Sequence, residues 1–160
     1  MLSVTLLCVG KMKEPYYIAA FEEYRKRLAA YCKLSVCELP EQRLPEDPSP
    51  REISAALEKE GAEIEKHIPP QAAVIALCVE GKQLSSSAFS QMLERRAVEG
   101  TSKLCFLIGG SFGLSETVKQ RADVKLSLSE MTFPHHLARV MLIEQLYRAF
   151  MIRNGSKYHK

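Results

Sequence analysis

The sequence lacks the features of a membrane or secreted protein. No apolar run approaches the roughly 20 residues of a membrane-spanning helix. The first nine residues have neither the basic flank nor the small-residue cleavage site of a signal peptide, so we expect a β-strand there and a cytoplasmic protein. With 46% hydrophobic and 26% charged residues among 160, the composition is typical of a globular protein with one core.

Paired cysteines are also missing. The five cysteines are an odd number and form no C-x-x-C motif, so neither a disulfide framework nor a zinc knuckle is indicated. Four of them fall in predicted strands, where free thiols behave as small buried hydrophobic side chains: Cys8, Cys37, Cys78 and Cys105. The neighbours His135 and His136 do not match a common ligand spacing and have no cysteine or carboxylate pair beside them. The sequence therefore predicts no metal site.

The phosphate-binding motifs of nucleotide enzymes are absent as well. The loop after the first predicted strand, residues 9–13, has no G-x-G-x-x-G pattern, and the sequence contains no G-x-x-x-x-G-K-[ST] motif. These absences argue against a dinucleotide-binding protein and a P-loop enzyme. The net charge of +3 is too small to establish a nucleic-acid partner, but it permits one where basic residues are clustered.

Strand-like and helix-like segments alternate along the chain. Apolar, β-branched runs predict strands over residues 2–9, 34–39, 72–79, 103–108 and 124–128. Helices are predicted between them, beginning at Pro15, at Pro50, after the serines at 85–87 and after Ser115, with a last helix from His135 to Arg153. The second helix has the clearest start, because Ser49, Pro50 and Glu52 form a capping box with proline at the first helical position. This alternation predicts an α/β fold, a mostly parallel sheet with helices on both faces.

Two late loops are candidates for ligand binding, since open α/β sheets bind ligands at the carboxyl ends of their strands. The glycine-rich loop, residues 109–115, has three glycines that allow positive φ or close approach of a ligand, although a tight turn would explain them too. The hydroxyl-rich loop, residues 127–134, offers hydroxyls and backbone donors before Pro134, although an ordinary helix entry would explain it. Their closeness in the sequence favours a shared ligand.

The predicted last helix is apolar around nearly its whole circumference. Such a helix needs a second partner surface, and in so small a protein a second copy supplies it, so we predict a homodimer through this helix. Tyr158 and His159 are unusual residues for a free tail. With His135 and His136 they are expected to place three of the four histidines near one end of the helix, in an acid–base or substrate-contacting role.

Several segments closely resemble the RlmH-type ribosomal RNA large-subunit pseudouridine N3-methyltransferases, which belong to the SPOUT class. They are residues 108–115, 126–135, 139–149 and the closing 158–160. The likeness extends from Val9 to the last residue. It implies one SPOUT methyltransferase domain over residues 1–160, a C-terminal trefoil knot, S-adenosylmethionine bound in a bent form within that knot, and a homodimer. Composition does not predict the knot, because chains rarely thread their own loops.

The resemblance also implies which residues form the site. The cofactor contacts would be Leu77 at a strand end, Gly109 in the glycine-rich loop, and a run in the hydroxyl-rich loop: Leu128, Ser129, Glu130, Met131, Thr132 and Phe133. Our hypothesis for the acceptor side places Arg139 where it orients the base or stabilises its anion. His135 lies beside it, and Tyr158 and His159 close over the partner subunit's cofactor.

The implied substrate is 23S rRNA in the assembled 70S ribosome, where N3 of a pseudouridine accepts the methyl group. A small enzyme that docks on a preformed particle needs fewer phosphate contacts than one that binds RNA alone, which agrees with the low net charge. Because the N3 proton must leave while the sulfonium methyl is already activated, the enzyme mainly aligns the reactants and assists deprotonation. Two alternatives stay open: a non-catalytic RNA- or ribosome-binding protein with the same fold, and a non-SPOUT α/β enzyme acting on a small nucleotide.

Overall fold

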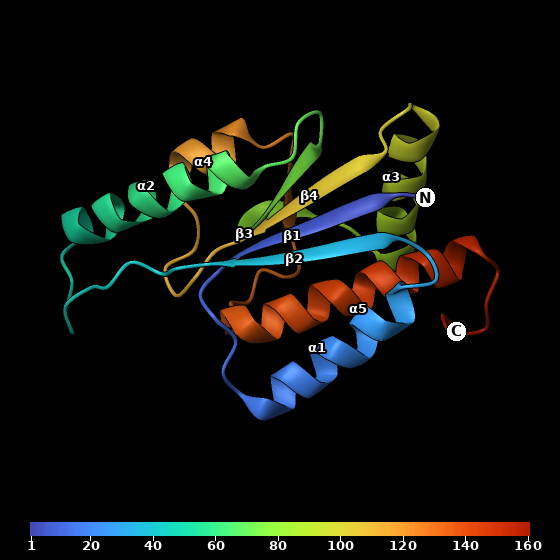
Figure 1. Cartoon of the computed structure of the whole chain (residues 1–160), viewed down its shortest axis with the longest axis horizontal. Helices are drawn as coiled ribbons and strands as arrows, with labels where there is room; N and C mark the ends of the chain where they lie inside the picture. The colour runs from blue at the N-terminus through green and yellow to red at the C-terminus, as the bar shows by residue number, and fades with distance from the viewer.

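The computed structural model describes residues 1–160 and contains five strands that alternate with five helices (Figure 1). The strands are β1 (Ser3–Val9), β2 (Lys33–Leu39), β3 (Ala73–Gln83), β4 (Lys103–Ile108) and β5 (Val124–Ser127). The helices are α1 (Pro15–Leu28), α2 (Pro50–His67), α3 (Ser86–Val98), α4 (Glu116–Arg121) and α5 (His135–Arg153). The predicted alternation is confirmed, and β4 and α5 have the predicted bounds.

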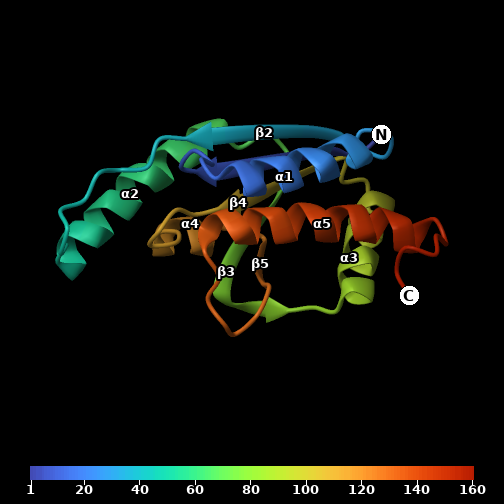
Figure 2. The same cartoon turned by 90° about the horizontal axis from the view of Figure 1, so that it is seen from below.

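The strands form one sheet in the order β2-β1-β4-β3-β5, and every neighbouring pair is parallel. Helices α1, α3 and α5 cover one face and pack on a core that includes Phe106 and Leu146. Helices α2 and α4 cover the other face over a smaller core that includes Leu107 (Figure 2). The predicted parallel sheet with helices on both faces is therefore confirmed, and its central strands β1 and β4 are buried on both sides.

Helix α2 begins with the predicted capping box. The Ser49 hydroxyl accepts a hydrogen bond from the Glu52 amide at 3.1 Å, and the Ser49 amide donates to the Glu52 carboxylate at 3.2 Å. We expect Ser49→Ala to lower the free energy of unfolding by about 1 kcal/mol, because an amide of the first turn loses its partner. Urea denaturation measures this change. Ser54→Ala, an exposed position in the same helix, should leave stability nearly unchanged.

Strand β3 departs from the prediction, because it continues past residue 79 after an interruption. Leu77 and Lys82 both pair with Leu126 of β5, so residues 78–81 leave the ladder as a bulge. Gly81 permits this path, since a Cβ there would lie 2.7 Å from the backbone of Lys125 and Leu126. The bulge lies at the edge of the sheet where the predicted ligand-binding loops emerge.

The cysteines agree only partly with their predicted burial. Cys8 and Cys105 are buried, whereas Cys37 in β2 and Cys78 in β3 are half-buried. Cys32, which follows α1, is buried although it was not assigned to a strand. All five are free thiols. No helix in the structure combines the length and apolar character needed to cross a bilayer.

Candidate functional site

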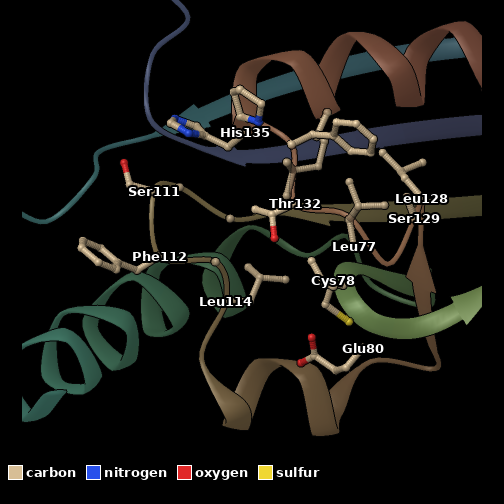
Figure 3. A pocket seen from close by; sticks show the side chains of 18 of the residues that line it. Leu77, Cys78, Glu80, Ser111, Phe112, Leu114, Leu128, Ser129, Thr132 and His135 are labelled. Carbon is tan, nitrogen blue, oxygen red and sulfur yellow. The ribbon is translucent and has the colours of Figure 1, made fainter.

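A cavity of about 580 Å³ opens where β4 and β5 end and β3 bulges (Figure 3). Most of its wall is formed by the β3 bulge with Leu77 before it, the glycine-rich loop after β4 and the hydroxyl-rich loop between β5 and α5. Lys119 of α4 and the start of α5 complete it. The two loops chosen from the sequence therefore meet at one site. A volume of this size is typical of small-molecule and cofactor pockets.

The glycine-rich loop is a tight turn that also leaves its backbone open toward the cavity. A side chain on Gly109 would overlap the carbonyl group of Gly113, and Gly113 has a φ of 81°. The Gly113 amide donates to the Gly110 carbonyl at 3.1 Å and closes the turn. Ser115 then caps α4 by accepting from the Val118 amide. Both interpretations of the glycines, a turn and an exposed backbone, apply to the same loop.

The hydroxyl-rich loop is held by its own hydroxyls. The Ser127 hydroxyl donates to the Ser129 carbonyl at 2.9 Å, and the Ser129 hydroxyl accepts from the Met131 amide at 3.1 Å. Met131 is 73% exposed at the mouth of the cavity. Phe112, on the glycine-rich loop, is 48% exposed there. Two large apolar side chains are thus left uncovered beside the opening.

Most of the residues expected to contact a cofactor lie together in this structure. Seven of the eight line the cavity: Leu77, Gly109, Leu128, Ser129, Met131, Thr132 and Phe133. Glu130 is the exception, because its side chain is exposed on the outer side of the loop and does not line the cavity.

His135 lines the cavity at the start of α5, whereas His136 points toward α1. Burial and the neighbouring charge of His136 lower the pKa of His135 below its ordinary value, so its imidazole is neutral at neutral pH. His136 Nδ1 lies 2.7 Å from a carboxylate oxygen of Glu14. The two adjacent histidines therefore have different surroundings, and only the first faces the site.

Arg139 lies behind the cavity wall and does not line it. It is 1% exposed and donates to the Glu38 carboxylate at 2.7 Å and to the Gly10 carbonyl at 3.0 Å. Glu38 also accepts from the Met12 amide at 2.8 Å. The buried guanidinium therefore ties α5 to the end of β2 and to the turn that follows β1.

Comparison with known proteins identifies the family. The sequence model of a family described as "Predicted SPOUT methyltransferase" matches residues 2–159. The chain belongs to the SPOUT methyltransferase family. The resemblance to the RlmH type is confirmed, and with it a methyltransferase with a parallel sheet flanked by helices. SPOUT methyltransferases generally use S-adenosylmethionine.

A solved structure supports the fold of this SPOUT protein. "The structure of a probable methylase family protein from Haemophilus influenzae Rd KW20" matches with a TM-score of 0.54 and 14% sequence identity. The match covers 99% of this chain and 70% of that chain. At that identity the likeness concerns the fold alone.

The tail of the SPOUT chain corrects one prediction, because the histidines do not gather at one end of the last helix. His135 and His136 begin α5, whereas Tyr158 and His159 follow its end, and a helix of 19 residues spans roughly 28 Å. The Tyr158 hydroxyl donates to Glu144 at 3.1 Å, and the guanidinium of Arg148 lies 4.8 Å from the centre of the Tyr158 ring. Within one chain the tail is docked on its own helix, away from the cavity.

Sequence reasoning missed an ion pair in the cavity wall. Lys119 of α4 and Glu80 of the β3 bulge both line the cavity and are bonded to each other. Burial opposes the charge of Lys119, but Glu80 and Glu116 outweigh it and raise the pKa of Lys119. The spacing of Glu116 and Lys119 on a helix was detectable. The contact with Glu80 was not, since it depends on how β3 bends.

The pKa of His135 gives a measurable property of the SPOUT site. In an NMR titration, we expect its imidazole to lose its proton at a midpoint below the ordinary 6.5. His135→Asn would assign the signal. Because only the neutral imidazole accepts a proton, an activity that uses it should fall as pH drops through that midpoint. A midpoint above 6.5 would contradict the desolvated environment.

Proposed function

We propose that this chain methylates N3 of a pseudouridine in 23S rRNA on the assembled 70S ribosome, with S-adenosylmethionine as methyl donor. The observation that carries the proposal is that the glycine-rich and hydroxyl-rich loops line one cavity. The chain that contains them matches the methyltransferase family model over residues 2–159. We further propose that residues 1–160 form one domain with a C-terminal trefoil knot, and that it acts in the cytoplasm.

The cavity fits S-adenosylmethionine in size and chemistry. The backbone of the glycine-rich loop lines the cavity at Gly109, Gly110 and Gly113, and Leu77 with Leu128 offers apolar surface. Glu80 supplies a carboxylate that can accept hydrogen bonds from hydroxyl or amino groups. When bound, the cofactor would supply a methyl group activated on a sulfonium.

The chain's own residues would align the acceptor and help its N3 proton to leave. His135 is a suitable proton acceptor because it lines the cavity and is neutral at neutral pH. Arg139 would act through the Gly10 carbonyl and Glu38, because contact with an RNA base would require it to leave both. We place it behind the acceptor, where it fixes the floor beneath His135.

A homodimer would complete the site. The groove beside α5, about 450 Å³ in volume, is lined by Val140, Met141 and Leu128 and gives a second copy an apolar surface. A second α5 packed in the opposite direction would carry Tyr158 and His159 toward this subunit's cavity. Sedimentation of a stable monomer at micromolar concentration would contradict this arrangement.

Deleting residues 158–160 tests the role of the tail. We expect methylation of ribosomes to fall by about 100-fold or more, the order of effect seen when positioning groups are lost. Binding of S-adenosylmethionine should change little, because the residues that would hold it belong to the other loops. Lys157→Ala is the matched control in the same tail. Unchanged methylation after the deletion would refute the tail's role.

The decisive experiment incubates the protein and labelled S-adenosylmethionine with 70S ribosomes and, separately, with naked RNA. We expect label at pseudouridine N3 in 23S rRNA of the ribosomes only. Label on free RNA alone, or on protein, would refute the ribosomal substrate. Cofactor binding without any transfer would favour a non-catalytic ribosome-binding protein, and calorimetry measures that binding directly.

A further inference from the structure

The connection between β2 and α2, residues 40–49, passes directly beside the glycine-rich loop. Glu41 in this connection accepts a hydrogen bond from the Ser111 amide at 2.9 Å, although the two residues are 70 positions apart in the chain. Ser111 itself lines the cavity. A carboxylate from outside the cavity wall thus holds the backbone of a loop that forms it.

Two glycines make room for this carboxylate. A Cβ on Gly110 would lie 2.5 Å from Glu41 Oε1 and 2.9 Å from its Cδ, closer than real contacts. A Cβ on Gly10 would lie 3.3 Å from Glu41 Oε2. The end of β1 and the loop after β4 both come close to the Glu41 carboxylate, and a glycine at each place leaves room for it, while Glu41 itself is exposed.

Glu41 also lies close to His135. The same Cβ position on Gly10 is 3.9 Å from His135 Nε2, so the carboxylate and the imidazole share one small region of the rim. Burial and the positive neighbours His136 and Arg139 lower the pKa of His135. The negative charges of Glu41 and Glu14 favour the protonated imidazole and oppose this decrease. Glu41 can thus affect both the loop and the candidate proton acceptor.

A buried group of α2 fixes the next residue. The Gln42 amide donates to a carboxylate oxygen of Glu60 at 2.8 Å, and Glu60 is only 6% exposed. Burial raises the pKa of Glu60, the Gln42 amide lowers it, and Glu41 raises it. Because the backbone at residue 42 is anchored on a helix, the Glu41 side chain projects from a fixed point.

We propose that Glu41 is a positioning residue of the cavity: it holds the Gly110–Ser111 backbone in the shape that leaves the ligand space open, and Glu60 anchors it through the Gln42 amide. The ligand, S-adenosylmethionine, rests on the proposed function. The bond to Ser111 itself does not, because both of its partners belong to this chain.

The test compares Glu41→Ala, Glu41→Gln and the control Glu46→Ala, an exposed carboxylate in the same connection. Calorimetry should give a Kd for S-adenosylmethionine about tenfold higher in Glu41→Ala, the effect of losing one charged hydrogen bond. Glu41→Gln keeps an acceptor oxygen and should restore most of the affinity. Glu46→Ala should bind like the native protein.

Two further readouts separate positioning from a purely structural role. The pKa of His135 should fall in both Glu41 variants, because both lose the carboxylate charge, while the Ser111 amide should exchange faster only in Glu41→Ala. Gly110→Ala should push the Glu41 carboxylate aside, so it should weaken binding in the native background about as much as Glu41→Ala does and add little to Glu41→Ala, where that carboxylate is absent. Additive effects would count against the proposal.

The outcomes distinguish the two proposals. If the native protein does not bind S-adenosylmethionine, the proposed function fails. The exchange rate of the Ser111 amide and the pKa of His135 in the Glu41 variants then still decide the role of Glu41. If native binding is seen, and Glu41→Ala changes neither affinity, Ser111 exchange nor the pKa of His135, the positioning role is overturned. Loss of binding in Glu41→Gln equal to that in Glu41→Ala would overturn the hydrogen bond as its cause.

Discussion

Replacing Gly109 with alanine is expected to weaken binding of S-adenosylmethionine by about 100-fold, equivalent to roughly 3 kcal/mol. The added methyl group would overlap the backbone carbonyl of Gly113, and no side chain can move aside to relieve the collision. The glycine-rich loop must therefore change its path, and the cavity wall changes with it. Calorimetry on the native and variant proteins measures the difference.

Gly100→Ala is the control for this prediction. Gly100 has a φ of 91° but nothing lies within 4 Å of its Cβ position, so alanine there strains the backbone without touching the cavity. It should cost about 1 kcal/mol of stability and leave the affinity unchanged. If Gly109→Ala bound the cofactor as tightly as Gly100→Ala does, the glycine-rich loop would not hold it.

Arg139→Ala is expected to lower the free energy of unfolding by about 3–5 kcal/mol. The substitution leaves the Glu38 carboxylate and the Gly10 carbonyl without their donor and opens a space under α5. Urea denaturation followed by circular dichroism measures the change. Arg139→Lys should recover only part of it, because a single ammonium does not reproduce the planar fork that reaches two acceptors.

Arg153→Ala provides the comparison, since this arginine is exposed in the last turn of the same helix. Its loss should change stability by less than about 0.5 kcal/mol. If the Arg139→Ala variant is as stable as the Arg153→Ala variant but has lost methylation activity, Arg139 contacts the acceptor base. That outcome would support the sequence-based hypothesis and contradict a supporting role behind the cavity wall.

The sequence predicted best where the signal is local. The capping box at Ser49 and Glu52 depends on residues three positions apart, and it is present as expected. Gly109 marks the end of β4, and Pro134, the N-cap residue, marks the start of α5. Both loops of the site were found in the same way, because each directly follows an apolar strand.

What the sequence could not predict depends on contacts between distant segments. The β3 bulge exists because two residues of one strand pair with Leu126 of another. Arg139 and Glu38 are 101 residues apart, and no local pattern in either segment indicates that the two side chains pair. The wrong prediction for the histidines has a different physical reason, since a helix of 19 residues necessarily separates His135 from Tyr158 and His159.

The position of β4 between β1 and β3 has a consequence for the folding of this protein. Ser3 pairs with Lys103, so the second edge of β1 is completed only by a segment about 100 residues later in the chain. During synthesis, β1, α1 and β2 can form a first unit, but its apolar open edge stays unpaired until β4 inserts. Pairing over such separations carries a large loop-closure cost, so the chain should fold slowly for its size. The same edge is the segment most exposed to aggregation before the sheet closes.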